Sequence, residues 1–74
     1  MKEEPAIARY YVNDNAQSNG DHEVHRETCD YLPKQENRTY LGQFDSCRPA
    51  VSAAKKIHPQ SNGCYWCSRE CHTS

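Results

Sequence analysis

Residues 62–74, NGCYWCSRECHTS, end the chain and hold three of its five cysteines. Cys64 and Cys67 are separated by two residues, a spacing at which two thiolates on a tight turn can both bind one zinc ion. Four tetrahedral ligands rarely come from one short turn, so a second pair must come from elsewhere. The fold therefore depends on which residues supply the other two ligands.

The composition indicates a small domain that needs a covalent or metal staple. Leu, Ile, Val and Phe account for only 8 of 74 residues, and the formal net charge is −1. So sparse a core rarely folds without a metal or disulfides.

The sequence has no apolar run typical of a secretory signal or a membrane span. We therefore expect a cytoplasmic protein that does not enter a membrane. Disulfides rarely persist in that reducing compartment, and five is an odd number for a disulfide framework. A bound metal ion is therefore favoured over disulfides as the cross-link that stabilises the domain.

The stretch VHRETC, residues 24–29, offers the missing pair of ligands. His25 and Cys29 are four residues apart, at the end of an expected strand and the start of a loop. With the C-terminal pair they predict a Cys3His site for Zn²⁺ formed by His25, Cys29, Cys64 and Cys67. Cys71 is an alternative ligand that could replace His25, whereas a loose tail is the other interpretation of Cys71 and His72.

Other chemical roles fit these residues less well. A redox CxxC belongs at a helix N-terminus in a βαβ setting, and haem attachment needs CxxCH, but Ser68 follows Cys67. Cys47 is expected to be a small buried residue, with a reactive thiol as the alternative. His22 and His58 are expected to be exposed. The aromatic side chains are expected to pack in the core and at its rim, with Trp66 a candidate contact residue.

The fold class expected is α+β, with a small three-stranded antiparallel sheet, one helix and a zinc-binding turn at the C-terminus. The strands are expected over residues 8–13, 23–27 and 38–44, with Asn19-Gly20 at a hairpin tip and Gly42 as a possible bulge.

A helix should follow the third strand. Asp45 or Ser46 can cap it, and Pro59 closes it. Its apolar stripe comprises Ala50, Val51, Ala54 and Ile57. The chain is thus expected to be one domain, 1–74, frayed at 1–6 and 72–74.

The two metal-binding stretches resemble the small metal-binding domain of the Ada methylphosphotriester repair protein and its short relatives. Matching parts are His25-R-E-T-Cys29, Asn37-R-T-Y-Leu41, the helix around Ala50 to Ala54, and Cys64-Y-W-Cys67. The resemblance covers roughly residues 8–67 and implies zinc, a small mixed sheet with a helix, a bacterial source and, in some relatives, DNA contact. The stretch between the two pairs is longer here than in the repair domain.

In the repair protein, the first ligand of the first pair is the cysteine that accepts the methyl group. This chain has His25 there, and imidazole is not the zinc-thiolate nucleophile that dealkylation requires. We therefore expect a monomeric, non-catalytic zinc module. The alternatives are a nucleic-acid-binding module of the Ada-like type, suggested also by scattered Arg and Lys residues, a protein-interaction module using Tyr65 and Trp66, and an enzyme using Cys47 or a zinc thiolate.

Overall fold

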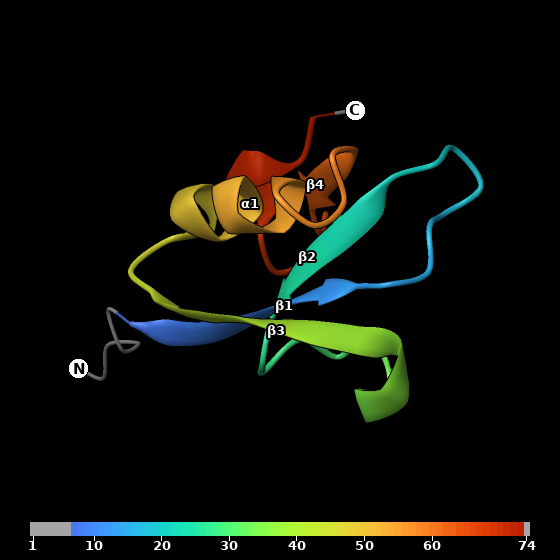
Figure 1. Cartoon of the computed structure of the whole chain (residues 1–74). Coiled ribbons are helices and arrows are strands. Elements are labelled where there is room, and N and C mark those ends of the chain that lie inside the picture. Colours follow the sequence, from blue (N-terminus) through green and yellow to red (C-terminus); the bar gives the residue numbers. More distant parts are fainter. Residues whose placement is uncertain (1–6, 74) are drawn as a thin grey trace.

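A four-stranded sheet with one helix packed on it forms the protein (Figure 1). The structure is a computed structural model that describes residues 7–73. The strands are ordered β3-β1-β2-β4 across the sheet. Along the chain the elements are β1 Ala8–Asn13, β2 His22–Arg26, a 3₁₀ turn η1 Gln35–Asn37, β3 Arg38–Phe44, α1 Cys47–Lys55, β4 Ser61–Gly63 and a second 3₁₀ turn η2 Arg69–Cys71.

The first three strands form an antiparallel sheet, as the sequence predicts. β1 and β3 have the expected bounds, and β2 begins and ends one residue earlier than expected. The central strand β1 pairs with β2 on one side and β3 on the other. Between Tyr10 and Tyr11 the β1–β3 register shifts by one residue, next to Gly42 with its φ of 126°. A positive φ of this kind suits glycine, so the predicted bulge at Gly42 is confirmed.

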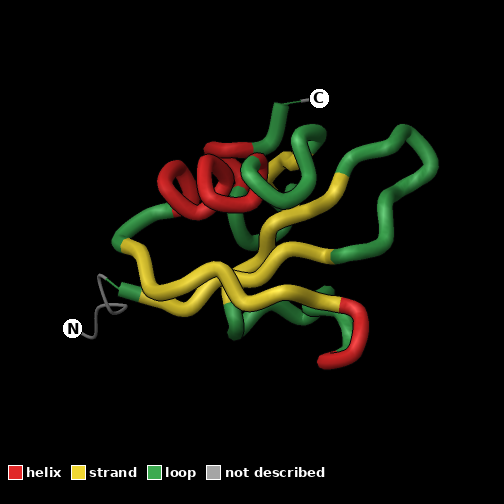
Figure 2. Tube along the Cα trace, in the orientation of Figure 1, coloured by secondary structure: helices red, strands yellow, loops and turns green. Residues whose placement is uncertain are grey.

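The prediction of only three antiparallel strands is wrong, because residues 61–63 form a fourth strand. β4 pairs with β2 in parallel, and His22 faces Ser61 while Val24 faces Gly63. Ser61, Asn62 and Gly63 lack the β-branched and aromatic residues typical of strands, so no local signal in the sequence indicates this strand. The sheet is therefore mixed, and β2 lies inside it (Figure 2).

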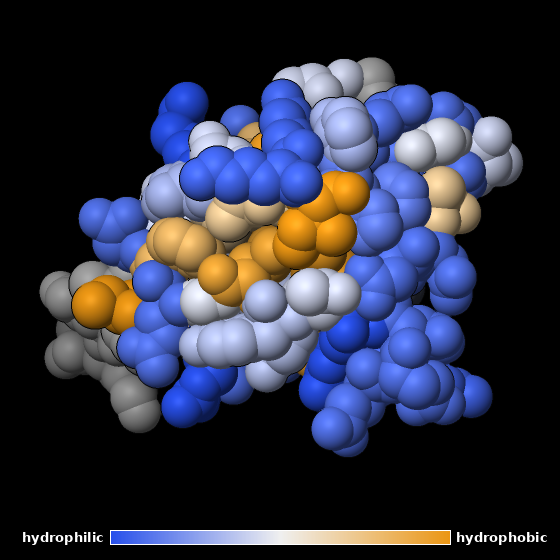
Figure 3. Space-filling view, viewed as in Figure 1, coloured by the Kyte–Doolittle hydropathy of each residue, from blue (hydrophilic) through white to orange (hydrophobic). Residues whose placement is uncertain are grey.

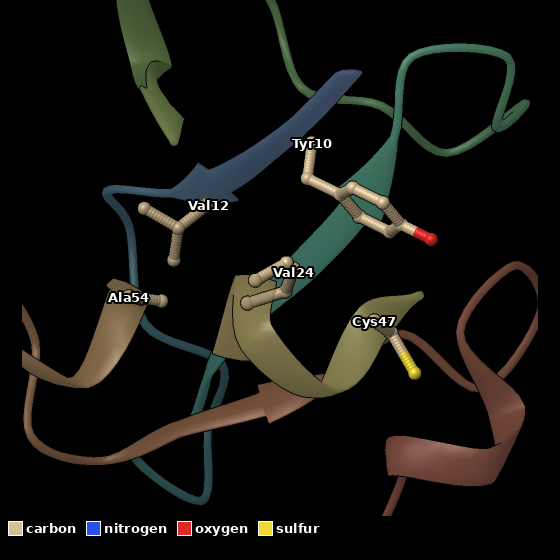
Figure 4. Close-up of a cluster of buried hydrophobic side chains, with 6 residues drawn as sticks. Tyr10, Val12, Val24, Cys47 and Ala54 are labelled. Atoms are coloured by element: carbon tan, nitrogen blue, oxygen red, sulfur yellow. The ribbon is translucent and has the colours of Figure 1, made fainter. Parts of the chain in front are cut away.

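The helix covers one face of the sheet and closes a small core. Ser46 is its N-cap residue, as expected, although its side chain makes no capping hydrogen bond. Figure 4 shows Tyr10, Val12 and Val24 pointing from the sheet toward α1. The buried cluster comprises Tyr10, Val12, Val24, Cys47, Ala50 and Ala54. Figure 3 shows apolar residues gathered where α1 meets the sheet, within a mostly hydrophilic surface.

The helix ends earlier than the apolar stripe predicts. The carbonyl of Ala54 accepts hydrogen bonds from the amides of both Ile57 and His58, at 2.9 and 2.8 Å, as the chain turns away before Pro59. Ile57 therefore lies beyond the last helical residue and is 49% exposed rather than part of the core. Among residues 7–73, no helix is long and apolar enough to cross a membrane.

The C-terminal residues run beside β4. The amide of Thr73 donates to Asn62 Oδ1 at 3.0 Å, and the Nδ1 of His72 lies 3.1 Å from the carbonyl oxygen of Gly63. These contacts differ from the fraying expected over 72–74. The expected fraying of residues 1–6, like residue 74, lies outside the described part of the chain.

Candidate metal centre

Parallel pairing of β2 with β4 brings the two distant stretches together. Val24 and Gly63 are opposite each other at the last paired position of β2 and β4, and the amide of Cys64 donates to the carbonyl of Val24 at 2.9 Å. The next residue on each strand is a candidate ligand, His25 on β2 and Cys64 after β4. Because parallel strands run the same way, both residues follow the last paired position at the same end of the β2–β4 pairing. The fourth strand thus assembles the site.

Two tight turns supply the other two ligands. After β2, the amide of Cys29 donates to the carbonyl of Arg26 at 3.0 Å and turns the chain back. After β4, the amide of Ser68 donates to the carbonyl of Cys64 at 2.9 Å, which places Cys67 on the same turn. The side-chain ligand atoms of His25, Cys29, Cys64 and Cys67 all lie within 4.8 Å of one another. This Cys3His group could hold a metal ion.

Each of the three sulfurs of this group accepts one backbone amide. The amide of Tyr31 reaches Cys29 Sγ at 3.4 Å, and the amide of Trp66 reaches Cys64 Sγ at 3.3 Å. Cys67 Sγ accepts the amide of Arg26 at 3.3 Å. Hydrogen bonds of this kind stabilise thiolates and fix the direction of metal ligands. The turns therefore orient the sulfurs as well as bringing them together.

His25 is a buried imidazole whose nitrogens are unsatisfied. Its side chain is 1% exposed, and neither ring nitrogen has a hydrogen-bond partner among residues 7–73. Glu23 Oε1 is 3.7 Å from Nε2, which is beyond hydrogen-bonding distance. Burial lowers the pKa of His25 from 6.5 to about 4, so the ring is neutral near pH 7. A buried unpaired polar atom is unfavourable, and a metal ion would provide a partner for one of these nitrogens.

Burial acts in the opposite direction on the thiols. It raises the pKa of the Cys64 thiol and raises the pKa of Cys67 to about 12, because the charged thiolate is poorly solvated there. A metal ion reverses this balance by coordinating the sulfur directly, and binding then releases the thiol protons.

Cys71, predicted as an alternative ligand, is bonded to Cys47 instead. The two cysteines form a disulfide with a Cα–Cα distance of 6.3 Å, and neither belongs to the four-residue group. Cys47 is 3% exposed, so its predicted burial is confirmed, but the sequence interpretation missed its bond. The preference for a metal over disulfides overlooked this single bond, because three of the five cysteines are free and belong to the candidate metal group. The two that remain make one pair.

His22 and His58, which were expected to be exposed, are partly buried and contact each other. The rings of His22 and His58 stack with their centroids 3.9 Å apart, and His58 Nε2 lies 3.0 Å from Asp14 Oδ1. Thr39 Oγ1 donates to the same carboxylate at 2.8 Å. These contacts join the β1–β2 loop to β3 and to the end of the helical segment. No local spacing in the sequence indicates them.

Exposed aromatic rings lie beside the candidate metal centre. Trp66 is 67% exposed, and its ring stacks on Tyr31 with a centroid distance of 5.8 Å. Tyr65 meets Trp66 edge-on, and the guanidinium of Arg69 lies 4.5 Å above the Tyr65 ring. A pocket of about 510 Å³ opens beside them, lined by Arg26, Thr28, Cys29, Asp30, Tyr31, Trp66 and Cys67. The exposure of Trp66 is consistent with its prediction as a candidate contact residue.

No protein-family model matches the chain, and no curated protein or solved structure is similar enough to count as a relative. The resemblance to the Ada-type domain therefore still depends on the motifs alone.

Proposed function

We propose that this chain is a small non-catalytic module that binds one structural Zn²⁺ through His25, Cys29, Cys64 and Cys67. The main support for this proposal is that the ligand atoms of these four side chains all lie within 4.8 Å of one another. Three thiolates and an imidazole make a ligand set typical of structural zinc, which prefers soft sulfur and nitrogen donors in a tetrahedral arrangement.

The spacing of the sulfurs supports zinc. Two sulfurs bound at about 2.3 Å to a tetrahedral zinc lie roughly 3.8 Å apart. The sulfurs of Cys29 and Cys64 are 3.9 Å apart. The ligands therefore need little rearrangement to bind the ion, and their amide hydrogen bonds stay in place.

A structural role fits both the ligand number and the small core. Four protein ligands close the coordination sphere and leave no open position for water or substrate. The buried hydrophobic residues are few and include two alanines and two cysteines. Zinc binding therefore supplies folding free energy that the core lacks. Methyl transfer is disfavoured because His25 stands where the resemblance requires a cysteine nucleophile.

Metal analysis combined with a proton–nitrogen spectrum tests this function. We expect one zinc per chain, loss of peak dispersion around the four ligands after a strong chelator, and recovery after zinc is returned. Full dispersion in protein that contains no zinc would rule out a structural metal.

The exposed aromatic surface favours a second candidate function, which is binding of single-stranded nucleic acid. We propose that bases stack on Tyr31, Tyr65 and Trp66, with Arg26 and Arg69 beside them, because such binding combines aromatic rings with cationic groups. Trp66 is the only tryptophan, so its fluorescence reports on this surface alone. Quenching by an oligonucleotide at low salt that disappears at high salt would support this role. No change at low salt would exclude it and leave a protein partner as the remaining ligand for this surface.

A further inference from the structure

The disulfide and the metal group are interleaved along the chain. The metal group joins residues 25–29 to residues 64–67, whereas the disulfide joins Cys47 to Cys71 across 24 residues. The segment closed by the disulfide therefore contains the second pair of ligands, Cys64 and Cys67. Any restraint on this segment also restrains half of the metal site.

The disulfide also packs directly against the residue that precedes a ligand. A side chain on Gly63 would place its Cβ 2.6 Å from Cys71 Cβ and 2.6 Å from the carbonyl oxygen of Ser68. There is no space between η2 and the end of β4. The position of Cys71 thus fixes where Cys64 begins the ligand turn.

Consecutive hydrogen-bonded turns connect the ligands to the disulfide. The amide of Ser68 donates to the carbonyl of Cys64, and the amide of Cys71 donates to the carbonyl of Ser68, both at 2.9 Å. A pocket of about 210 Å³ is lined by Cys47 of the disulfide and by Cys67 of the metal group. Figure 4 shows the Cys47 sulfur pointing from α1 toward the C-terminal segment. The two cross-links therefore restrain one continuous unit.

We propose that the Cys47–Cys71 disulfide is a redox latch on the metal site, so that the oxidised protein binds zinc more tightly than the reduced protein. The inference rests on the proposed zinc-binding function and adds a regulation of the same site. With the latch closed, the turn carrying Cys64 and Cys67 is ordered before the ion arrives. With the latch open, zinc binding must itself order that turn, which lowers the affinity.

The latch opens by thiol–disulfide exchange with a dithiol reductant. A thiolate of the reductant attacks one sulfur of the Cys47–Cys71 bond, the bond breaks, and a mixed disulfide forms. The second thiol of the reductant resolves this intermediate. Two electrons and two protons end on the sulfurs of Cys47 and Cys71, and the reductant leaves as its disulfide. Glu70 Oε2 lies 3.6 Å from Cys47 Sγ, where it can accept a hydrogen bond from the new Cys47 thiol.

Coupling between two sites is reciprocal at equilibrium. Bound zinc should therefore lower the equilibrium constant for reduction of the disulfide by the same factor by which the disulfide raises zinc affinity. Coupling of this type typically changes affinity by 5- to 150-fold. We therefore expect reduction to weaken zinc binding at least about fivefold.

The test compares zinc affinity in the oxidised and reduced protein by competition with a chromophoric chelator. A phosphine reductant is used because it offers no thiol to the metal. Alkylation in denaturant verifies each state, with three modified cysteines in the oxidised protein and five in the reduced protein. The matched control replaces both Cys47 and Cys71 by serine. This variant should bind zinc as weakly as reduced wild type and should not respond to the phosphine.

A second readout starts from folded, zinc-loaded, oxidised protein, and therefore does not depend on how well a variant folds. Adding the phosphine should speed zinc release to the chelator in wild type but not in the double serine variant. Equal affinity in both redox states, or tighter binding by the reduced protein, would overturn the latch while leaving the zinc module intact. Uptake of a second zinc only after reduction would also overturn it, because Cys47, Glu70 and Cys71 would then be ligands. Absence of zinc binding in both states would overturn the proposed function and the latch together.

Discussion

Val24 and Gly63 lie opposite each other at the last paired position of two parallel strands, and this pairing brings the candidate ligands His25 and Cys64 together. The strand that carries Gly63 has only three residues, all small or polar. This short strand positions the candidate site, because it joins the C-terminal turn to the sheet next to the candidate ligands of β2 and the turn that follows β2.

Replacing His25 by alanine should reduce zinc affinity roughly a hundredfold to a thousandfold. A structural zinc site contributes roughly 10–16 kcal/mol, and losing one of four ligands removes about a quarter of it. Chelator competition measures the change. His25→Cys should retain binding within about tenfold because it restores four ligands, and His58→Ala should bind like wild type. Equal losses in all three variants would mean that His25 acts through folding rather than coordination.

The contact between β4 and η2 predicts that Gly63→Ala destabilises the protein. The added methyl group would meet Cys71 Cβ and the backbone oxygen of Ser68, and the backbone cannot move aside without breaking the β2–β4 pairing. We expect a loss of about 1–3 kcal/mol in the free energy of unfolding, measured by urea titration of zinc-loaded protein. Ser52→Ala, on the exposed side of α1, should change it by less than about 0.5 kcal/mol. A stable Gly63→Ala variant would contradict the packing described here.

Acid should weaken the Asp14–His58 contact. The hydrogen bond from His58 holds the pKa of Asp14 below its ordinary value of 3.8, with a smaller contribution from Thr39. Since the pKa is lower in the folded state, the stabilisation is fully present above the unfolded value and disappears as pH falls through the folded value.

The stability difference between wild type and Asp14→Asn should therefore be constant above about pH 5 and shrink toward zero below pH 4. Urea titrations of both proteins across this range, each loaded with zinc to the same extent, measure it. Loss of metal at low pH affects both proteins alike and cancels in the difference. A difference that stays constant from pH 6 to pH 3 would show that the carboxylate charge contributes nothing.

Replacing exposed Trp66 or buried Tyr10 by alanine should change the free energy of unfolding by different amounts. Trp66→Ala should change the free energy of unfolding by less than about 1 kcal/mol, because its ring packs mainly on Tyr31 at the surface. Tyr10→Ala should cost about 3–5 kcal/mol, since Tyr10 is 4% exposed and packs in the core beside Phe44. Thermal unfolding of zinc-loaded variants provides the comparison. A Trp66→Ala loss as large as that of Tyr10→Ala would place Trp66 in the core.

The parts of the structure that could be predicted from sequence have local signals. The aromatic and β-branched residues of β1 and β3 specify those strands, and the spacings within residues 25–29 and 64–67 identify ligand pairs. Both pairs come together in the structure, so their grouping could be predicted from the sequence alone.

The parts that could not be predicted depend on contacts between distant segments. Ser61, Asn62 and Gly63 become a strand only because the edge of β2 is available to pair with them. Cys47 and Cys71 meet only because α1 and η2 pack against each other and against β4, and no spacing along the chain indicates this. The stacked pair His22 and His58 is likewise a product of tertiary packing.

The central claim is that His25, Cys29, Cys64 and Cys67 bind one zinc ion together. X-ray absorption at the zinc edge, on purified protein with its metal content measured, tests this most directly. The proposed site predicts one zinc per chain with three sulfur ligands at about 2.3 Å and one nitrogen ligand at about 2.0 Å. A chain without zinc, or a zinc bound mainly by oxygen, would contradict it.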